Sequence, residues 1–107
     1  MNVTYAEKTK QDVLLLQRPS EMLGELVGRW SDTVSLEWDR GGKLNGPPLY
    51  TLRISGLGEQ VSATFAPDEL RSPSRLRGRL LELWGDLLQL RSDAQMRHLQ
   101  ELVLERE

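Results

Sequence analysis

The segment from Ser72 to Arg91 limits the fold more than any other part of the chain, because it carries two apolar stripes on one helical pattern. Ser72 can cap the helix with its hydroxyl group, and Pro73 suits the first helical position. At about 100° per residue, the first stripe contains Leu76, Leu80, Leu83, Leu87 and Leu90, and the second contains Leu81, Trp84 and Leu88. A surface helix usually needs only one such stripe. The second stripe therefore has to meet a neighbouring helix or another molecule.

Two glycines lie on the flank of this helix that carries the second stripe. Gly78 and Gly85 each cost about 1 kcal/mol relative to alanine inside a helix. Their missing side chains would let a second backbone come close. The candidate protein-interface residues are therefore Gly78, Leu81, Trp84, Gly85 and Leu88.

The centre of the chain alternates apolar and polar residues with the period of two that strands require. Turn-forming residues separate three such segments, at 39–48 and at 55–58. The pattern predicts a three-stranded antiparallel meander with one apolar face, made of Val34, Leu36, Trp38, Tyr50, Leu52, Ile54, Val61, Ala63 and Phe65.

The segments before the meander give weaker signals. Residues 1–12 are mostly polar, and we expect them to be loosely ordered. The apolar run 13–16 fits either a short buried strand or one turn of helix, with helix preferred. Pro19 and Ser20 predict a break and a cap before a short amphipathic helix, whose apolar face includes Met22, Leu26 and Trp30.

The segment after Arg91 predicts a break in the C-terminal helix. Residues 92–95 have the form of a capping box, with serine first and glutamine three residues later. The apolar residues Met96, Leu99, Leu102 and Val103 are out of phase with the upstream stripe. A kink or a new helix is therefore expected at Ser92.

These patterns predict an α+β fold in which a short amphipathic helix precedes a three-stranded antiparallel β-meander covered by two C-terminal helices. The length of 107 residues fits one domain, spanning 1–107. Because the start of the chain lacks an apolar signal core and no apolar run could span a bilayer, we expect a cytoplasmic protein without membrane contact. Arginine outnumbers lysine and leucine is abundant, a bias typical of a GC-rich bacterial genome.

The residues that usually carry catalysis or bind metals are scarce. The chain has no cysteine and one histidine, so it offers neither thiolate chemistry nor a histidine-rich metal site. His98 lies on the polar side of its helical pattern, without an oriented partner for proton transfer. We predict no catalytic residues, no cofactor and no metal, and hence a protein that is not an enzyme.

Four arginines form the one strongly charged cluster. Arg71, Arg75, Arg77 and Arg79 lie near a helix start, where cations oppose the helix dipole. Phosphate groups could bind both these side chains and the free amides of the helix. Ordinary ion pairing with nearby acidic residues is the preferred explanation of the cluster, because the formal net charge of −2 does not favour a polyanion.

Two hypotheses for the function follow from these patterns. The first is a small protein-interaction module that acts as an adaptor, accessory or regulatory subunit of a larger bacterial complex, or as a homodimer. The alternative is a nucleic-acid-binding accessory protein that uses the arginine cluster. The salt dependence of binding distinguishes the two, because phosphate contacts weaken steeply with salt.

Overall fold

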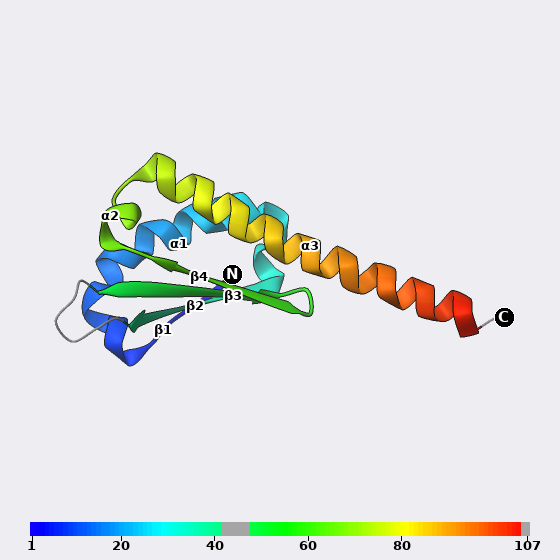
Figure 1. Ribbon diagram of the computed structural model, residues 1–107. Coiled ribbons are helices and arrows are strands. Elements are labelled where there is room, and N and C mark those ends of the chain that lie inside the picture. Colours follow the sequence, from blue (N-terminus) through cyan, green and yellow to red (C-terminus); the bar gives the residue numbers. More distant parts are fainter. Residues whose placement is uncertain (42–47, 106–107) are drawn as a thin grey trace.

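In a computed structural model, which describes residues 1–41 and 48–105, the chain forms a four-stranded mixed sheet with helices on one face (Figure 1). The strands are β1 (Asn2–Tyr5), β2 (Val34–Gly41), β3 (Leu49–Gly56) and β4 (Glu59–Phe65), and their order in the sheet follows the sequence. Strand β1 is parallel to β2, whereas the other pairs are antiparallel. The α+β class predicted from the sequence is confirmed.

The predicted meander corresponds to β2, β3 and β4. The register pairs Leu36 with Ile54 and Trp38 with Leu52, so these side chains share one face. All nine predicted face residues lie on that face, where Val61 and Ala63 on the edge strand β4 are half-buried and the other seven are buried. The first predicted turn falls largely on residues 42–47, which lie outside the described residues.

The second turn of the meander is a two-residue hairpin loop. Leu57 and Gly58 both have positive φ, at 56° and 81°, as a type I′ turn between twisted strands requires. The preceding Gly56 has a different role, since a Cβ there would come within 2.7 Å of the Thr33 carbonyl oxygen. The hairpin therefore packs tightly against the segment that enters β2.

The prediction of a loosely ordered N-terminus is wrong. Residues 2–5 form β1, and Val3 and Tyr5 pack against the core from the edge of the sheet. The Ala6 amide then donates to the Trp38 carbonyl oxygen at 2.9 Å. Parallel neighbours need a crossover connection, which the helical segment between β1 and β2 supplies.

The predicted break at Pro19 is also wrong. Helix α1 (Val13–Val27) runs through this residue, between the 3₁₀ segments η1 (Glu7–Asp12) and η2 (Gly28–Thr33). The helix continues because its buried residues form one uninterrupted stripe across the proline: Leu16, Pro19, Ser20, Leu23 and Val27. Burial of this stripe offsets the backbone hydrogen bond that a proline removes, at a cost of about 3 kcal/mol.

Ser20 links α1 to the centre of the sheet. Its hydroxyl group donates to the Leu16 carbonyl oxygen at 2.9 Å and accepts a hydrogen bond from the Trp38 indole nitrogen at 2.8 Å. Both residues are buried, so this is the partner that the buried indole N–H needs. The serine that the sequence suggested as a helix cap is therefore a hydrogen-bonding partner inside the core.

The C-terminal part contains one short and one long helix. Helix α2 (Pro67–Leu70) is a single turn, and α3 (Pro73–Glu105) is continuous over 33 residues. The predicted break at Ser92 is wrong, and one helix takes the place of the expected two. Ser92 therefore lies inside α3 and caps no new helix, and the neighbouring Asp93 carboxylate accepts a hydrogen bond from the Gln89 amide one turn earlier, at 3.0 Å.

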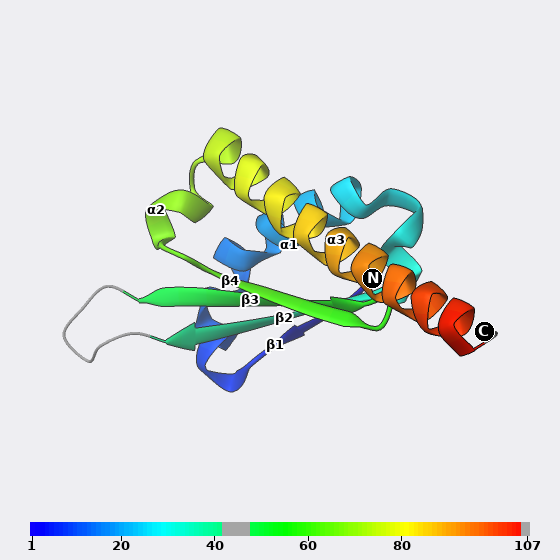
Figure 2. The same cartoon turned by 45° about the vertical axis from the view of Figure 1, so that its right-hand side comes forward.

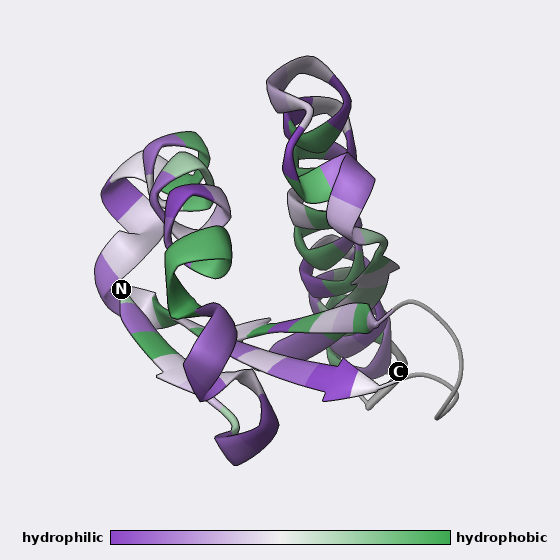
Figure 3. Cartoon of the chain, turned by 90° about the vertical axis from the view of Figure 1, so that its left-hand side faces the viewer, coloured by the Kyte–Doolittle hydropathy of each residue, from purple (hydrophilic) through white to green (hydrophobic). Residues whose placement is uncertain are grey.

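The helices and the sheet form two layers. Helices α1 and α3 lie side by side on the apolar face of the sheet (Figures 2 and 3). The opposite face is open and polar, with Glu37 and Arg53 paired across β2 and β3 at 3.2 Å. The last turns of α3 extend beyond the sheet and give the molecule its longest dimension, 59 Å.

Trp38 and Phe65 test this account of the core. Both are completely buried, with their ring centroids 6.1 Å apart. Replacing either residue with alanine should lower the free energy of unfolding by about 3–5 kcal/mol, because the removed ring leaves a cavity. Chemical denaturation measures the loss, and a loss below about 1 kcal/mol at both positions would contradict the assigned face of the sheet.

Candidate protein-interaction surface

Helix α3 buries one face over its first half, up to Leu87, and exposes another face along its described length. The buried face packs between the sheet and α1, and consists of Leu76, Leu80, Leu83, Trp84 and Leu87. This is the first stripe predicted from the sequence, with Trp84 added. Leu90, which the pattern placed on the same stripe, is 39% exposed where the helix leaves the sheet.

The second face carries a line of exposed residues that we call the outer stripe: Gly78, Leu81, Gly85, Leu88, Ser92, Met96, Leu99 and Val103. At about 100° per residue these positions fall within one sector of the helix. The exposed fraction of the five large apolar residues ranges from 37% at Leu88 to 61% at Val103, and Leu102 beside them is 41% exposed. The stripe is therefore apolar and open over seven helical turns.

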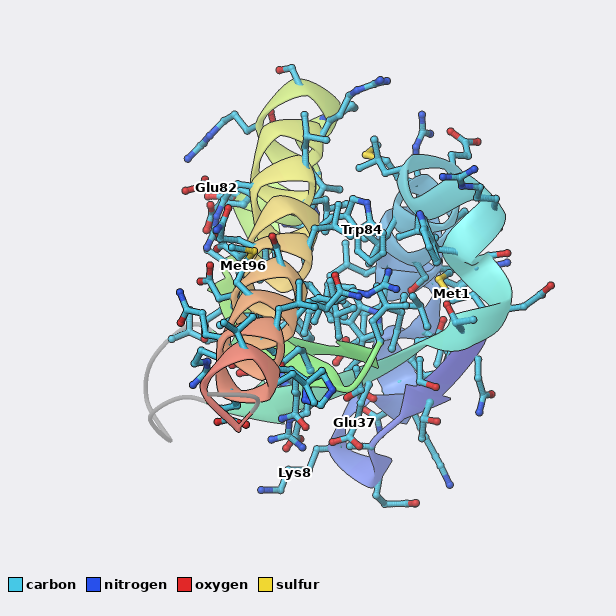
Figure 4. The ribbon with its side chains drawn as sticks, turned by 90° about the vertical axis from the view of Figure 1, so that its right-hand side faces the viewer. Met1, Lys8, Glu37, Glu82, Trp84 and Met96 are labelled. Atoms are coloured by element: carbon cyan, nitrogen blue, oxygen red, sulfur yellow. The ribbon has the colours of Figure 1, made fainter. Side chains whose placement is uncertain are left out.

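The structure divides the predicted interface residues into two groups. Gly78, Leu81, Gly85 and Leu88 lie on the outer stripe, where they are exposed. Trp84 is 6% exposed and points toward α1, whereas Met96 lies on the side of α3 that faces away from α1 (Figure 4). Trp84 is thus a core residue, because α1 covers the edge of the second stripe on which it lies.

The two glycines face open space. A Cβ built at Gly78 or Gly85 meets no described atom within 4 Å outside the helix itself, so neither glycine is required by packing inside the described chain. Each still lowers the stability of the helix relative to alanine. Packing within the described chain thus explains neither glycine, and another molecule could pack against them.

The end of α3 explains why the sequence suggested a break. Beyond Leu90, the next positions in phase with the buried leucines are Arg91, Ala94 and His98, which are polar or small. The apolar residues Met96, Leu99 and Val103 instead continue the outer stripe. The change of phase therefore marks the point where the buried face ends, not a break in the helix.

A groove of about 820 Å³ lies where α3 leaves the sheet. It is lined by Leu57 of the hairpin and by Arg91, Ala94, Gln95, His98 and Leu99 of the helix.

The Arg91 guanidinium lies 5.1 Å from the centre of the Trp30 ring, which Arg29 also approaches at 5.3 Å. Trp30 belongs to η2 and not to the amphipathic helix predicted for it, because α1 ends at Val27.

The four candidate arginines do not form one patch. The Arg79 guanidinium donates to the Thr64 carbonyl oxygen at 2.8 Å and to the Glu69 carboxylate at 2.9 Å. It also lies 4.3 Å from the centre of the Phe65 ring. Arg79 therefore joins α3 to the edge strand β4 and to α2, a role that no spacing in the sequence indicates.

The other three arginines are exposed. Arg71 lies 3.8 Å from Asp68 in a surface pair, and such pairs contribute little to stability. Arg75 and Arg77 form no ion pair or hydrogen bond with another described residue. Of the four arginines in the predicted anion-binding cluster, these are the two for which no ion pair or hydrogen bond with a described residue is found.

The carboxylate of Glu69 is part of the same link between α2 and α3. It accepts a hydrogen bond from the Ala66 amide at 3.0 Å, as half of a capping box. This hydrogen bond, followed by that from Arg79, holds the pKa of Glu69 below its ordinary value against the opposing effect of burial.

The described residues contain no arrangement typical of a metal site. No three histidine or acidic side chains converge among them, and His98 is exposed. Among the described helices, none has the length and apolarity needed to cross a membrane. Comparisons of the chain with known protein families, with curated proteins and with solved structures give no match.

Arg79 and Arg77 should respond differently to substitution. Arg79→Gln removes a charge-assisted pair and a cation–π contact, and should lower the free energy of unfolding by about 1–2 kcal/mol. Arg77→Gln, two residues away and exposed, is the matched control and should change it by less than about 0.5 kcal/mol. Equal effects in urea denaturation would contradict the structural role of Arg79.

Glu69 should contribute a pH-dependent part of the stability. Because its pKa is lower in the folded chain than in the unfolded chain, its contribution is present above the ordinary value of 4.5 and is lost as the pH falls through the folded pKa. Glu69→Gln should therefore be less stable than the wild type at pH 7, with the difference shrinking below pH 4.5. Thermal melts across this range measure the difference, and one that widened in acid would contradict the assignment.

Proposed function

We propose that this protein is a non-enzymatic protein-interaction module, a small adaptor, accessory or regulatory subunit that uses the outer stripe of α3 as its contact surface. The observation that supports the proposal is the exposure of apolar side chains along one side of a 33-residue helix. Single exposed leucines are common on soluble proteins, but a contiguous apolar strip usually marks a binding surface.

The energetics of the outer stripe favour a covered state. Fully burying a leucine, methionine or valine side chain contributes about 1.5–3 kcal/mol, and Leu81, Met96, Leu99 and Val103 each expose more than half of their surface. A partner that covers the stripe would gain this contribution at several positions. Gly78 and Gly85 would let its backbone approach closely.

The projecting end of α3 supports the same proposal. The C-terminal part of the helix extends past the sheet (Figure 1). Every residue from 92 to 103 is exposed except Ala94, which is half-buried. In proteins, most of the stability of a helix comes from tertiary packing of its apolar face. A partner along the outer stripe would supply that packing.

The nucleic-acid alternative has less support. Arg79 is engaged with Glu69 and Thr64, and so only Arg71, Arg75 and Arg77 of the cluster are exposed. The formal net charge of the chain is −2. A protein interface uses the exposed apolar residues of the outer stripe, whereas a nucleic-acid site leaves them without a role.

Leu81→Glu tests the proposed surface. Because Leu81 is exposed, the variant should unfold at the wild-type denaturant midpoint in dilute solution, while a charge placed in an apolar contact should weaken association at least tenfold. Gln100→Glu adds the same charge to the same helix beside the stripe and should retain association.

The measurement is native mass spectrometry of the purified chain and of complexes captured on it. The proposal predicts a partner, either a second copy or another protein, that the wild type and Gln100→Glu hold and Leu81→Glu releases. Retention of every partner by a folded Leu81→Glu variant would contradict it.

A further inference from the structure

The proposed function leaves the partner open, and the pattern of the outer stripe identifies one. We propose that the stripe binds a second copy of this chain, with the two α3 helices antiparallel and a two-fold axis passing beside Ser92. In this dimer the projecting end of each helix lies along the outer face of the other copy. The proposal rests on the proposed function, because it uses the same surface.

The spacing of the stripe is the same in both directions from Ser92. Toward the N-terminus the stripe residues are Leu88, Gly85 and Leu81, which lie 4, 7 and 11 positions away. Toward the C-terminus they are Met96, Leu99 and Val103, at the same three distances. Two antiparallel copies centred at Ser92 therefore place a stripe residue opposite a stripe residue at each of these levels, from Leu81 to Val103.

The sizes of the side chains also match across this arrangement. Gly85, whose outer side is open, comes level with Leu99 of the second copy. Leu88 comes level with Met96, and Leu81 with Val103. The half of the stripe that carries glycine thus faces the half that carries only large apolar residues, and each copy supplies both halves.

The positions around the helix are compatible with side-by-side packing. At 100° per residue, Leu88 lies toward one edge of the stripe and Met96 toward the other, and the same holds for Leu81 and Val103. Under a two-fold axis, level side chains then lie beside each other and do not collide head-on. The 11-residue repeat that relates Leu81, Ser92 and Val103 also keeps the stripe nearly parallel to the helix axis, so that two almost straight helices can pack along it.

A parallel dimer uses the stripe less well. In a parallel pair in register, every residue meets its own counterpart, so Gly78 faces Gly78 and Gly85 faces Gly85. These two layers would bury almost no apolar side chain. The antiparallel arrangement fills the space beside Gly85 with a leucine that is 56% exposed in the single chain.

The size of the contact predicts a weak dimer. From Leu81 to Val103 the stripe is about 33 Å long, and two helices pack about 10 Å apart, so the strip covers roughly 330 Å² on each copy. The two copies together would bury roughly 660 Å² in this strip, which is well below the roughly 1,200 Å² of a standard specific interface, and flanking residues such as Leu102 would add to it. We therefore expect dissociation in the micromolar range and a dimer that forms as the concentration rises.

Sedimentation velocity of the full chain from about 1 to 500 µM tests for the dimer. The proposal predicts a monomer at the lowest concentration and a dimer at the highest. Leu99→Glu should raise the dissociation constant at least tenfold, whereas the matched control Gln100→Glu, which adds the same charge beside the stripe, should change it less than threefold. Leu99 lies outside the core, so the circular dichroism of the variant checks that its fold is retained.

Cysteine cross-linking tests the orientation, since the chain has no cysteine of its own. An equal mixture of the Gly85→Cys and Leu99→Cys variants should form mixed disulfides. Leu99→Cys alone should not form one, because the two copies of residue 99 would be at least about 21 Å apart, far beyond the reach of a disulfide. Rapid cross-linking of Leu99→Cys with itself would overturn the antiparallel arrangement.

The outcomes separate this inference from the proposed function. A chain that is monomeric at every concentration, but that captures another protein in a way that Leu81→Glu abolishes, overturns the second copy and leaves the interaction module standing. A chain that neither dimerises nor captures a partner through the stripe overturns both.

Discussion

The fold depends on the packing of one face of α3 against the sheet and α1. Leu76, Leu80 and Leu87 are each at most 1% exposed, and Trp84 closes the seam with α1. This face occupies only the first half of a helix that continues to Glu105. The second half has no comparable support within the described chain, and the apolar residues there lie in phase with the outer stripe. The same helix therefore acts as the main core element at one end and as an exposed surface along its side.

Much of the fold was predictable because the strands and α3 carry strong periodic signals. The alternation around Trp38, Leu52 and Phe65 identified the meander and its buried face correctly. Strand β1 was missed because four residues at a terminus give too short a pattern, and its pairing with β2 is decided by contacts distant in sequence. The break at Pro19 was predicted from local preference, which burial of a continuous stripe overrode.

The candidate surface was predictable in part. The apolar sector on residues 76–90 is wider than the buried face of α3, so Leu81 and Leu88 of that sector are exposed, and Gly78 and Gly85 face open space. The sequence could not reveal that α1 covers Trp84, since this depends on how two helices pack. It also could not reveal that Arg79 reaches Thr64 and Glu69, because those partners come from other elements.

Hydrogen exchange of the backbone amides of residues 92–103, followed as a function of protein concentration, tests the central claim most directly. In a single chain these turns lack tertiary packing, so their amides should exchange rapidly in dilute solution. Pairing of the outer stripes should slow their exchange as the concentration rises through the micromolar range, while the amides of β2 and β3 stay equally protected throughout. Exchange at 92–103 that is equally fast at all concentrations, or equally slow at all of them, would contradict the account.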